Sequence, residues 1–168
     1  DNAPASRGYS GGFGNDVIDL SGITDVSIVV EIHGGDGDDT LKGGASADSL
    51  FGDGGNDALR FDNLDTSVVG GAGLDTATVT APTGAVSLNL FTGEIETVSA
   101  TTSTFHNLFD ATGATWNVAI TGGSGTDTLD ANAAGSAVTL DMFAADAEVA
   151  HGSSYADSIT ASGATWAV

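Results

Sequence analysis

The stretch that decides the fold is residues 34–60, GGDGDDTLKGGASADSLFGDGGNDALR. It divides into three contiguous blocks of nine residues, GGDGDDTLK (34–42), GGASADSLF (43–51) and GDGGNDALR (52–60). Each block begins with glycine, has aspartate at its sixth place and has leucine at its eighth. A fixed period of this kind indicates a repeat protein, in which each unit packs mainly against its neighbours.

Further copies of the block lie on both sides of this stretch. Residues 11–19 (GGFGNDVID), 70–78 (GGAGLDTAT) and 122–130 (GGSGTDTLD) fit the pattern, and 152–160 (GSSYADSIT) is a degenerate copy. The block resembles the nonapeptide of the RTX (repeat-in-toxin) family of secreted bacterial proteins. The resemblance implies an all-β fold, a right-handed parallel β-roll or β-solenoid with calcium-binding GGxGxDxUx turns, where U is apolar. Two nonapeptides then make one coil of 18 residues.

The residue types in the block suit calcium. This ion takes six to eight oxygen ligands from carboxylates and backbone carbonyls in flexible geometry. The sixth-place aspartate supplies a carboxylate, and glycine allows backbone conformations that turn carbonyls toward one point. We therefore expect several Ca²⁺ ions and predict as metal-binding residues Asp16, Asp39, Asp48, Asp57, Asp75 and Asp127, with the turn residues Gly35, Asp36, Gly37, Asp53, Gly55, Gly71 and Gly73.

The spacing of the aspartates predicts where the ions lie. Asp39, Asp57 and Asp75 follow one another at intervals of 18, so they should form one column on one side of the roll. Ions are expected between turns 34–39 and 52–57, and between turns 52–57 and 70–75. Asp16 lies 23 residues before Asp39, so five extra residues must loop out between these two coils.

The other side of the roll is predicted to be poorer. Asp48 has Val30 and Thr66 at a distance of 18, with Asp65 one residue out of step, so we expect a weak or altered site there. In the C-terminal half Asp127 is a plausible ligand. Asp157 belongs to the degenerate block, and the alternative for both is that they are ordinary turn residues.

A longer duplication covers the C-terminal two-thirds. Residues 105–118 match 155–168 at a shift of 50, and residues 70–91 match 122–143 at a shift of 52. We therefore predict a calcium-binding β-roll over residues 1–80 and a less regular β-solenoid over residues 81–168, with a unit of about fifty residues repeated at 70–118 and 122–168. Short strands are expected at 17–19, 26–32, 40–42, 49–51, 58–60, 76–80, 86–90 and 138–142, and the one helix-like stretch at 143–150.

The composition limits the partners. Lys and Arg total 3 against 23 Asp and Glu, a net charge of −20, while 40% of the residues are hydrophobic. The apolar content argues against plain disorder, so cations are expected to neutralise a folded body. The acidity argues against nucleic acid and anionic membranes. Cysteine is absent, which excludes thiolate metal sites and disulfides, and no apolar stretch is long enough to span a membrane.

Signs of catalysis are missing from the sequence. The histidines, His33, His106 and His151, have no short ligand spacing, and neither an HExxH nor a GxSxG motif occurs. Trp116 and Trp166 hold equivalent places in the duplication, which favours a core or cap position over a sugar-stacking surface. The first residues, DNAP, lack the basic and apolar regions of a signal peptide, so we expect a mature product, a fragment, or export without an N-terminal signal.

Two functions fit these observations. The first is a non-enzymatic extracellular module of a Gram-negative bacterium, part of a surface layer, adhesin or matrix filament, that folds and assembles when it binds calcium. Copies of itself or a cell-surface polysaccharide would be its partners. The alternative is an accessory domain of a larger type I-secreted protease, lipase, alginate epimerase or toxin, with catalysis elsewhere in that protein.

Overall fold

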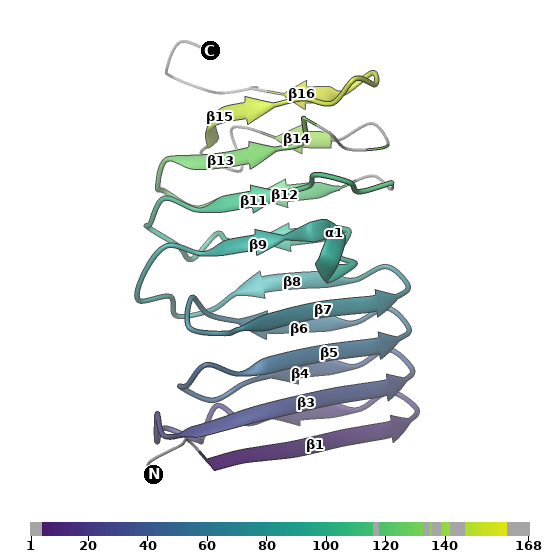
Figure 1. The fold of residues 1–168 in the computed structure, drawn as a ribbon, viewed down its shortest axis with the longest axis vertical. Coiled ribbons are helices and arrows are strands. Elements are labelled where there is room, and N and C mark those ends of the chain that lie inside the picture. Colours follow the sequence, from purple (N-terminus) through teal and green to yellow (C-terminus); the bar gives the residue numbers. More distant parts are fainter. Residues whose placement is uncertain (1–4, 116–117, 133–134, 136–138, 142–146, 161–168) are drawn as a thin grey trace.

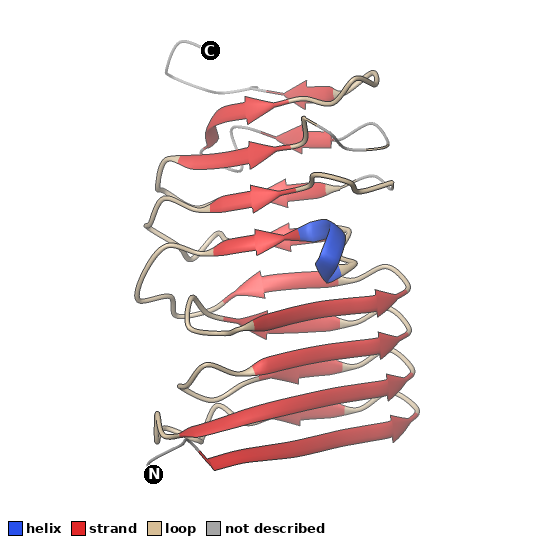
Figure 2. Ribbon diagram, viewed as in Figure 1, coloured by secondary structure: helices blue, strands red, loops and turns tan. Residues whose placement is uncertain are grey.

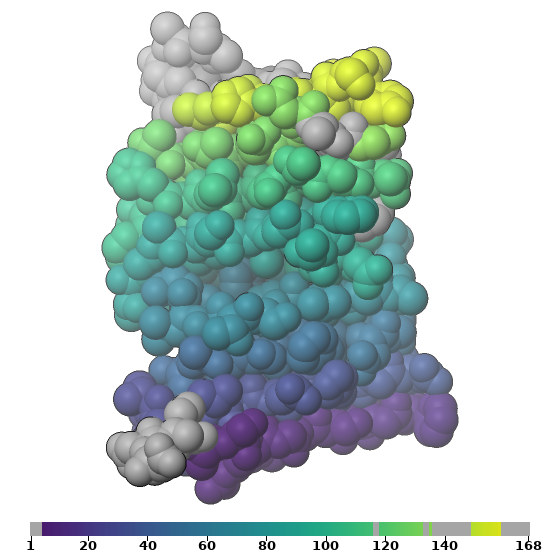
Figure 3. Space-filling model, in the orientation of Figure 1, coloured from purple at the N-terminus to yellow at the C-terminus, as the bar shows by residue number. Residues whose placement is uncertain are grey.

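The fold is a stack of short parallel strands with almost no helix (Figures 1 and 2). It is seen in a computed structural model, which describes residues 5–115, 118–132, 135, 139–141 and 147–160. Trp116 and Trp166 lie outside the described residues. Successive segments of the chain form successive layers from one end of the molecule to the other (Figure 3).

The N-terminal half contains β1 (Ala5–Phe13), β2 (Val17–Asp19), β3 (Ile28–Asp36), β4 (Thr40–Lys42), β5 (Ser49–Gly54), β6 (Ala58–Phe61), β7 (Ser67–Ala72) and β8 (Thr76–Val79). The remaining elements are β9 (Ser87–Asn89), α1 (Leu90–Gly93), β10 (Thr97–Ser99), β11 (Leu108–Asp110), β12 (Ala119–Thr121), β13 (Asp127–Asp130), β14 (Thr139–Asp141), β15 (Ala147–His151) and β16 (Ser158–Thr160).

The strands alternate between two walls. The even-numbered strands form one eight-stranded sheet in the order β16-β14-β12-β10-β8-β6-β4-β2. The odd-numbered strands form two four-stranded sheets, β1-β3-β5-β7 and β15-β13-β11-β9, with a break between β7 and β9 where α1 lies (Figure 1). All paired strands are parallel, which confirms the predicted β-roll class.

The register shows where the period of 18 holds. Glu31 pairs with Ser49 and Ser49 with Ser67, both at a shift of 18. The first step is longer, since Ala5 pairs with Ile28, a shift of 23. The five extra residues lie in the connection between β2 and β3, as predicted. Beyond β8 the steps lengthen, because Thr76 pairs with Thr97, a shift of 21.

The two copies of the long duplication lie on opposite walls. The turn 70–75 leads into β8 of the eight-stranded sheet, whereas its copy 122–127 leads into β13 of the other wall. The same is true of 105–110, which runs into β11, and 155–160, which runs into β16. Each copy is five strands after its original. Because the walls alternate, an odd number of strands transfers the copied turn to the other edge of the roll.

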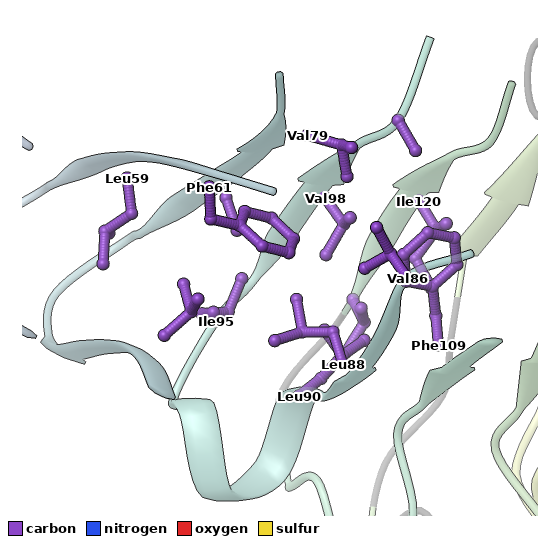
Figure 4. Packing of buried hydrophobic residues seen from close by; sticks show 14 of the residues in the cluster. Leu59, Phe61, Val79, Val86, Leu88, Leu90, Ile95, Val98, Phe109 and Ile120 are labelled. Atoms are coloured by element: carbon purple, nitrogen blue, oxygen red, sulfur yellow. The ribbon is translucent and has the colours of Figure 1, made fainter. Parts of the chain in front are cut away.

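The core is a thin layer of side chains between the walls. Alternate residues of each strand point inward, and the eighth-place residues Leu41, Leu50 and Leu59 are completely buried. Figure 4 shows the wider central part, where Phe61, Leu88, Ile95 and Phe109 fill the space beside α1, along with other buried aliphatic residues. No helix of the described residues is long and apolar enough to cross a membrane.

One local prediction was wrong. The helix expected at 143–150 is absent where it can be described, since β15 occupies Ala147–His151 and pairs with β13. Backbone pairing with a neighbouring strand overrides the weak helix preference of this alanine-rich segment. The strand expected at 86–90 ends at Asn89, whose side chain caps the short helix α1 by accepting from the Thr92 N–H.

Shortening one core leucine should destabilise the roll far more than shortening an exposed one. Leu59 is 0% exposed, so Leu59→Ala should lower the free energy of unfolding by about 2–5 kcal/mol. Leu74 is 70% exposed, and Leu74→Ala should change it by less than about 0.5 kcal/mol. Chemical denaturation at a fixed calcium concentration measures both. Equal losses for the two variants would contradict the assigned core.

Candidate metal centre

The turns at one edge of the roll carry the predicted aspartate column. We call this the calcium edge and define it by turns 11–16, 34–39, 52–57 and 70–75, each of which leads into a strand of the eight-stranded sheet. It lies at the arrowheads of β1, β3, β5 and β7 in Figure 1. The turns at the other end of these strands form the opposite edge, which includes Asp48, Asp65, Asn107 and Asp127.

Hydrogen bonds link the aspartates of the calcium edge in a ladder. The Asp39 N–H donates to Asp57 Oδ1 at 2.7 Å, and the Asp57 N–H donates to Asp75 Oδ1 at 2.7 Å. Asp16 joins the same ladder, since its N–H donates to Asp39 Oδ1 at 2.7 Å. The predicted column of Asp39, Asp57 and Asp75 is therefore confirmed, and Asp16 extends it by one coil.

The second carboxylate oxygen of every aspartate in this ladder lacks a donor. The Oδ2 atoms of Asp16, Asp39, Asp57 and Asp75 are buried and have no hydrogen-bond partner among the described residues. Asp39 and Asp57 are 2% exposed and Asp75 is 0% exposed, so water does not satisfy these oxygens either. A buried charged oxygen without a partner is strongly unfavourable. A row of four such atoms is the arrangement that bound cations would satisfy.

Backbone carbonyls converge on the same places. A Cβ atom added to Gly11 would lie 2.6 Å from Asp16 Oδ2 and 2.6 Å from the Gly34 carbonyl oxygen of the next coil. Gly34 meets Asp39 Oδ2 and the Gly52 oxygen in the same way, both closer than 3.0 Å. These first glycines, Gly11 and Gly34, have no partner in the pairing of adjacent strands. Each bare Cα therefore leaves room for one carboxylate oxygen and one carbonyl oxygen from adjacent coils.

The second and fourth places of these turns need a left-handed backbone. Gly35 and Gly37 have φ of 109° and 128°. A Cβ atom at either place would collide with the backbone carbonyl of Gly12 or Gly14 in the preceding coil. The equivalent residues Gly55, Gly71 and Gly73 repeat this conformation and this close approach. Only glycine meets both requirements without strain, so the turn shape is specified locally by sequence.

Two of the predicted acidic residues face outward. Asp36, at the third place of its turn, is exposed. Asp53 occupies a glycine place with φ 72°, and its Oδ2 lies 3.0 Å from His33 Nδ1 on the surface. Its carbonyl nevertheless points at Gly71, as the glycine carbonyls do. The Asp53 carboxylate therefore faces His33, and its backbone oxygen faces the next coil.

A second ladder runs along the calcium edge and was missed in the sequence. The Oδ1 atoms of Asn15, Asp38 and Asn56 accept the N–H of the fifth-place residue one coil later, at 2.8–3.0 Å. Fifth-place side chains thus accept from the coil that follows in the sequence, whereas sixth-place carboxylates accept from the coil that precedes. The signal was available, because Asn or Asp fills the fifth place of three successive turns.

The aspartates of the opposite edge are satisfied within the protein. Asp48 Oδ1 accepts the Val30 N–H and the Ser46 hydroxyl, both at 2.8 Å, and Oδ2 accepts the Gly44 N–H at 2.6 Å. The weak or altered calcium site expected at Asp48 stays a prediction, and both oxygens of this carboxylate accept hydrogen bonds from the protein. Asp65 sits one residue out of step, as expected, and its Oδ1 accepts the Asp48 N–H at 3.1 Å.

Asp127 has a similar set of donors. Its Oδ1 accepts the N–H and the side-chain amide of Asn107, at 2.9 and 2.7 Å, and its Oδ2 accepts the Gly123 N–H at 3.0 Å. Gly123 and Gly125 lack the positive φ of their counterparts on the calcium edge. The turn 122–127 therefore keeps the consensus letters but takes a different shape.

Side chains alone do not form a metal cage. Within the part of the chain that the structure describes, no group of three or more His, Cys, Asp or Glu side chains comes close enough to hold an ion. Each coil supplies one buried carboxylate, so most ligands must be carbonyls. This donor set suits calcium, a hard cation that prefers oxygen, and does not suit zinc, which prefers imidazole or thiolate.

Comparison with known families agrees with this geometry. Residues 31–59 and 117–134 match the model of the RTX calcium-binding nonapeptide repeat, in four copies. These two segments are therefore RTX-type calcium-binding nonapeptide repeats. No curated protein and no solved structure matches it.

The matched residues include two kinds of turn. Residues 31–59 contain the RTX turns of Asp39 and Asp57, with unpaired carboxylate oxygens, and also the satisfied turn of Asp48. Residues 117–134 contain the satisfied turn of Asp127. The chain is thus a calcium-binding repeat module in which the RTX consensus alone does not mark the oxygens that need a cation.

Burial makes two carboxylates of the calcium edge, Asp57 and Asp75, hard to ionise without a cation. It raises the pKa of Asp57 to about 6, and the charges of Asp75 and Asp39 add to the rise. Burial likewise raises the pKa of Asp75, with Glu96 and Glu94 adding to it. On the opposite edge, burial raises the pKa of Asp65 to about 7, with a contribution from Asp62.

The calcium-free RTX module should therefore be more stable in acid. The folded-state pKa of Asp57, about 6, lies above its ordinary value of 3.8, so the folded chain binds the proton more tightly than the unfolded chain. The resulting stabilisation is complete below the ordinary value and is lost as the pH rises through about 6. In excess chelator, β structure measured by circular dichroism should increase as the pH falls from about 7.5 to about 5.

The variant Asp57→Asn is the control for this titration. It removes the ionisable group and should reduce the pH response without abolishing it, because Asp75 also titrates with a raised pKa. A signal that stays flat, or that falls with acid over this range in the unsubstituted protein, would contradict the assignment.

Proposed function

We propose that this RTX module is an extracellular structural element that folds when calcium enters its calcium edge. The ligands are the carboxylates of Asp16, Asp39, Asp57 and Asp75 and the backbone carbonyls of the turn residues, including those of Gly35, Gly37, Asp53, Gly55, Gly71 and Gly73. The four buried Oδ2 atoms without a donor carry the proposal. Bound calcium would neutralise these carboxylates and coordinate the oxygens that no hydrogen-bond donor of the described residues reaches.

Calcium and folding are coupled by electrostatics. Parallel strands stack about 4.8 Å apart, so the aspartates of adjacent coils hold like charges at nearly that distance. The chain as a whole carries a net charge of −20, which opposes compaction further. Because the sites require stacked coils, the free energy of binding becomes free energy of folding. Extracellular calcium modules bind with dissociation constants of about 10⁻⁴–10⁻³ M, well above cytosolic calcium concentrations.

Asp48 and Asp127 have a different role in this proposal. Both oxygens of each carboxylate already accept hydrogen bonds from the protein. We assign them to holding their turns together rather than to binding ions. The opposite edge then keeps its shape independently of calcium once the coils are stacked.

Exchanging one aspartate on each edge tests this division. Asp57→Asn removes a ligand charge worth about 1.5–3 kcal/mol, so the calcium concentration at half-folding should rise by roughly tenfold or more. Asp48→Asn places an amide against backbone donors and should lower stability at every calcium concentration, without changing the number of ions bound. Circular dichroism during calcium titration and calorimetric stoichiometry measure these effects. A full β spectrum in excess chelator near neutral pH would contradict calcium-coupled folding.

The N-terminal surface favours a module that stacks on another coil. A Cβ atom on Gly12 or Gly14 would meet nothing within 4 Å, although the equivalent Gly35 and Gly37 are pressed against carbonyls of the coil before them. Asp16 Oδ1 has no donor in the described residues, whereas the Oδ1 of Asp39 accepts an N–H from the preceding coil. The surface therefore matches one more parallel coil with a GGxGxD turn.

This stacking can be tested by duplicating residues 5–27 in tandem. The native step from Ala5 to Ile28 is 23 residues, so the duplicate should stack on β1 in the same register. We expect one additional calcium ion per chain and a higher unfolding temperature in calcium. A matched duplicate with Asn in place of its own Asp16 should add no ion. Unchanged stoichiometry with the unaltered duplicate would exclude a coil-binding surface.

Such a surface suits a surface-layer, adhesin or filament module, and equally an accessory domain of a larger type I-secreted enzyme. RTX repeats are typical of secreted bacterial proteins, and we place this one outside a Gram-negative cell. The encoding gene separates the two functions, since a catalytic domain beside the repeats supports the second. Ordered assemblies in calcium, seen by electron microscopy, support the first.

A further inference from the structure

The calcium edge continues past its last consensus turn. After turn 70–75, the next turn on this edge is residues 90–96, LFTGEIE, which contains α1 and has no GGxGxD pattern. We propose that this turn completes one more calcium site, formed by the Asp75 carboxylate, the Glu94 carbonyl and the Glu96 carboxylate. The inference rests on the proposed function and adds a site that the nonapeptide pattern does not predict.

Asp75 supplies an oxygen with an unmet requirement at this place. The residue is 0% exposed, and its Oδ2 has no hydrogen-bond partner among the described residues. Asp75 Oδ1 accepts the Asp57 N–H, so only Oδ2 is left for an ion. This oxygen faces the following turn, 90–96, as Asp57 Oδ2 faces turn 70–75.

Glu94 provides the carbonyl that a first-place glycine provides elsewhere. A Cβ atom on Gly70 would lie 2.5 Å from Asp75 Oδ2 and 2.5 Å from the Glu94 oxygen. The same pairing of oxygens occurs at Gly11, where the carbonyl comes from Gly34. The pair of oxygens beside Gly70, one from a carboxylate and one from a carbonyl, is thus preserved, although the turn that supplies the carbonyl has a different sequence.

The backbone at Glu94 explains how a different turn reaches this position. Glu94 is left-handed, with φ 48° and ψ 56°, and its N–H bonds to carbonyls at the start of α1. A non-glycine residue in this region is held against a steric cost. Strain of this kind persists where surrounding contacts fix it and is common at binding sites. Here the left-handed residue ends α1 and sets the carbonyl beside Gly70.

Glu96 takes the sixth-place role. Its Oε2 accepts the Asp75 N–H at 2.7 Å, as Asp75 accepts from Asp57. The step to this coil is 21 residues, not 18, because α1 is inserted. The glutamate side chain is one methylene longer than that of aspartate, so its carboxylate still reaches the Asp75 N–H from this longer coil and continues the column. The series ends there, because the Glu96 carbonyl accepts the Ala119 N–H and the residue before Ala119 is Val118, which has no oxygen in its side chain.

The test counts calcium ions bound to the full chain. Glu96→Gln keeps an acceptor for the Asp75 N–H but removes the charge, and it should bind one ion fewer than the unsubstituted protein. Glu94→Gly keeps the carbonyl and suits the left-handed backbone, so it should retain every ion. Glu31→Gln removes an exposed carboxylate from another surface and should also retain every ion. Calorimetry with calcium chloride and equilibrium dialysis measure the stoichiometry.

Three outcomes are informative. Loss of one ion in Glu96→Gln, with a native spectrum in calcium, supports the site. Retention of all ions with unchanged affinities overturns it and leaves the consensus sites standing. If the unsubstituted protein binds no calcium, the proposed function fails and this inference with it. Should Glu96→Gln not fold, Glu96→Asp keeps the charge with a shorter reach and should weaken one site only; unchanged affinity at every site in that variant overturns the assignment.

Discussion

One carboxylate oxygen per coil, buried and out of reach of any donor, is the constraint on which the calcium edge depends. A backbone N–H of the preceding coil donates to Oδ1 of Asp39, Asp57 and Asp75. The ladder that aligns the coils therefore also leaves Oδ2 of each aspartate buried. Parallel stacking then repeats this arrangement about every 4.8 Å. The strand pairing that builds the roll cannot be completed at low electrostatic cost without cations, and the cations have no site until the coils stack.

The sequence predicts this edge well because the coil length is constant there. Steps of 18 residues keep Asp39, Asp57 and Asp75 in phase, so position in the chain translates directly into position in the column. Asp16 needed the structure, since a step of 23 could have changed the phase. Glu96 could not be predicted, because it enters the column through a helical insertion that changes both the step and the residue type.

The duplication shows that turns with the same sequence pattern can have different surroundings. The turn 122–127 repeats 70–75, but five strands separate their positions and the walls alternate, so the copy faces the other edge. It meets Asn107 there instead of an aspartate one coil away. Gly123 and Gly125 lack the positive φ of their counterparts, and both oxygens of Asp127 accept hydrogen bonds from the protein. The sequence similarity identified the GGxGxD turn correctly, but it did not indicate on which edge of the roll the turn would lie.

The two edges solve the same electrostatic problem in different ways. On the opposite edge, the Gly44 and Gly123 N–H groups donate to Oδ2 of Asp48 and Asp127, the oxygen that lacks a donor on the calcium edge. A neutral donor from the protein satisfies the carboxylate without adding charge, and it remains in place whether or not calcium is available. Within the part of the chain that the structure describes, the calcium edge has no such donors beside its Oδ2 atoms. We therefore expect calcium dependence to follow from which neighbour each aspartate meets: a backbone N–H beside Oδ2 on the opposite edge, and no donor among the described residues on the calcium edge.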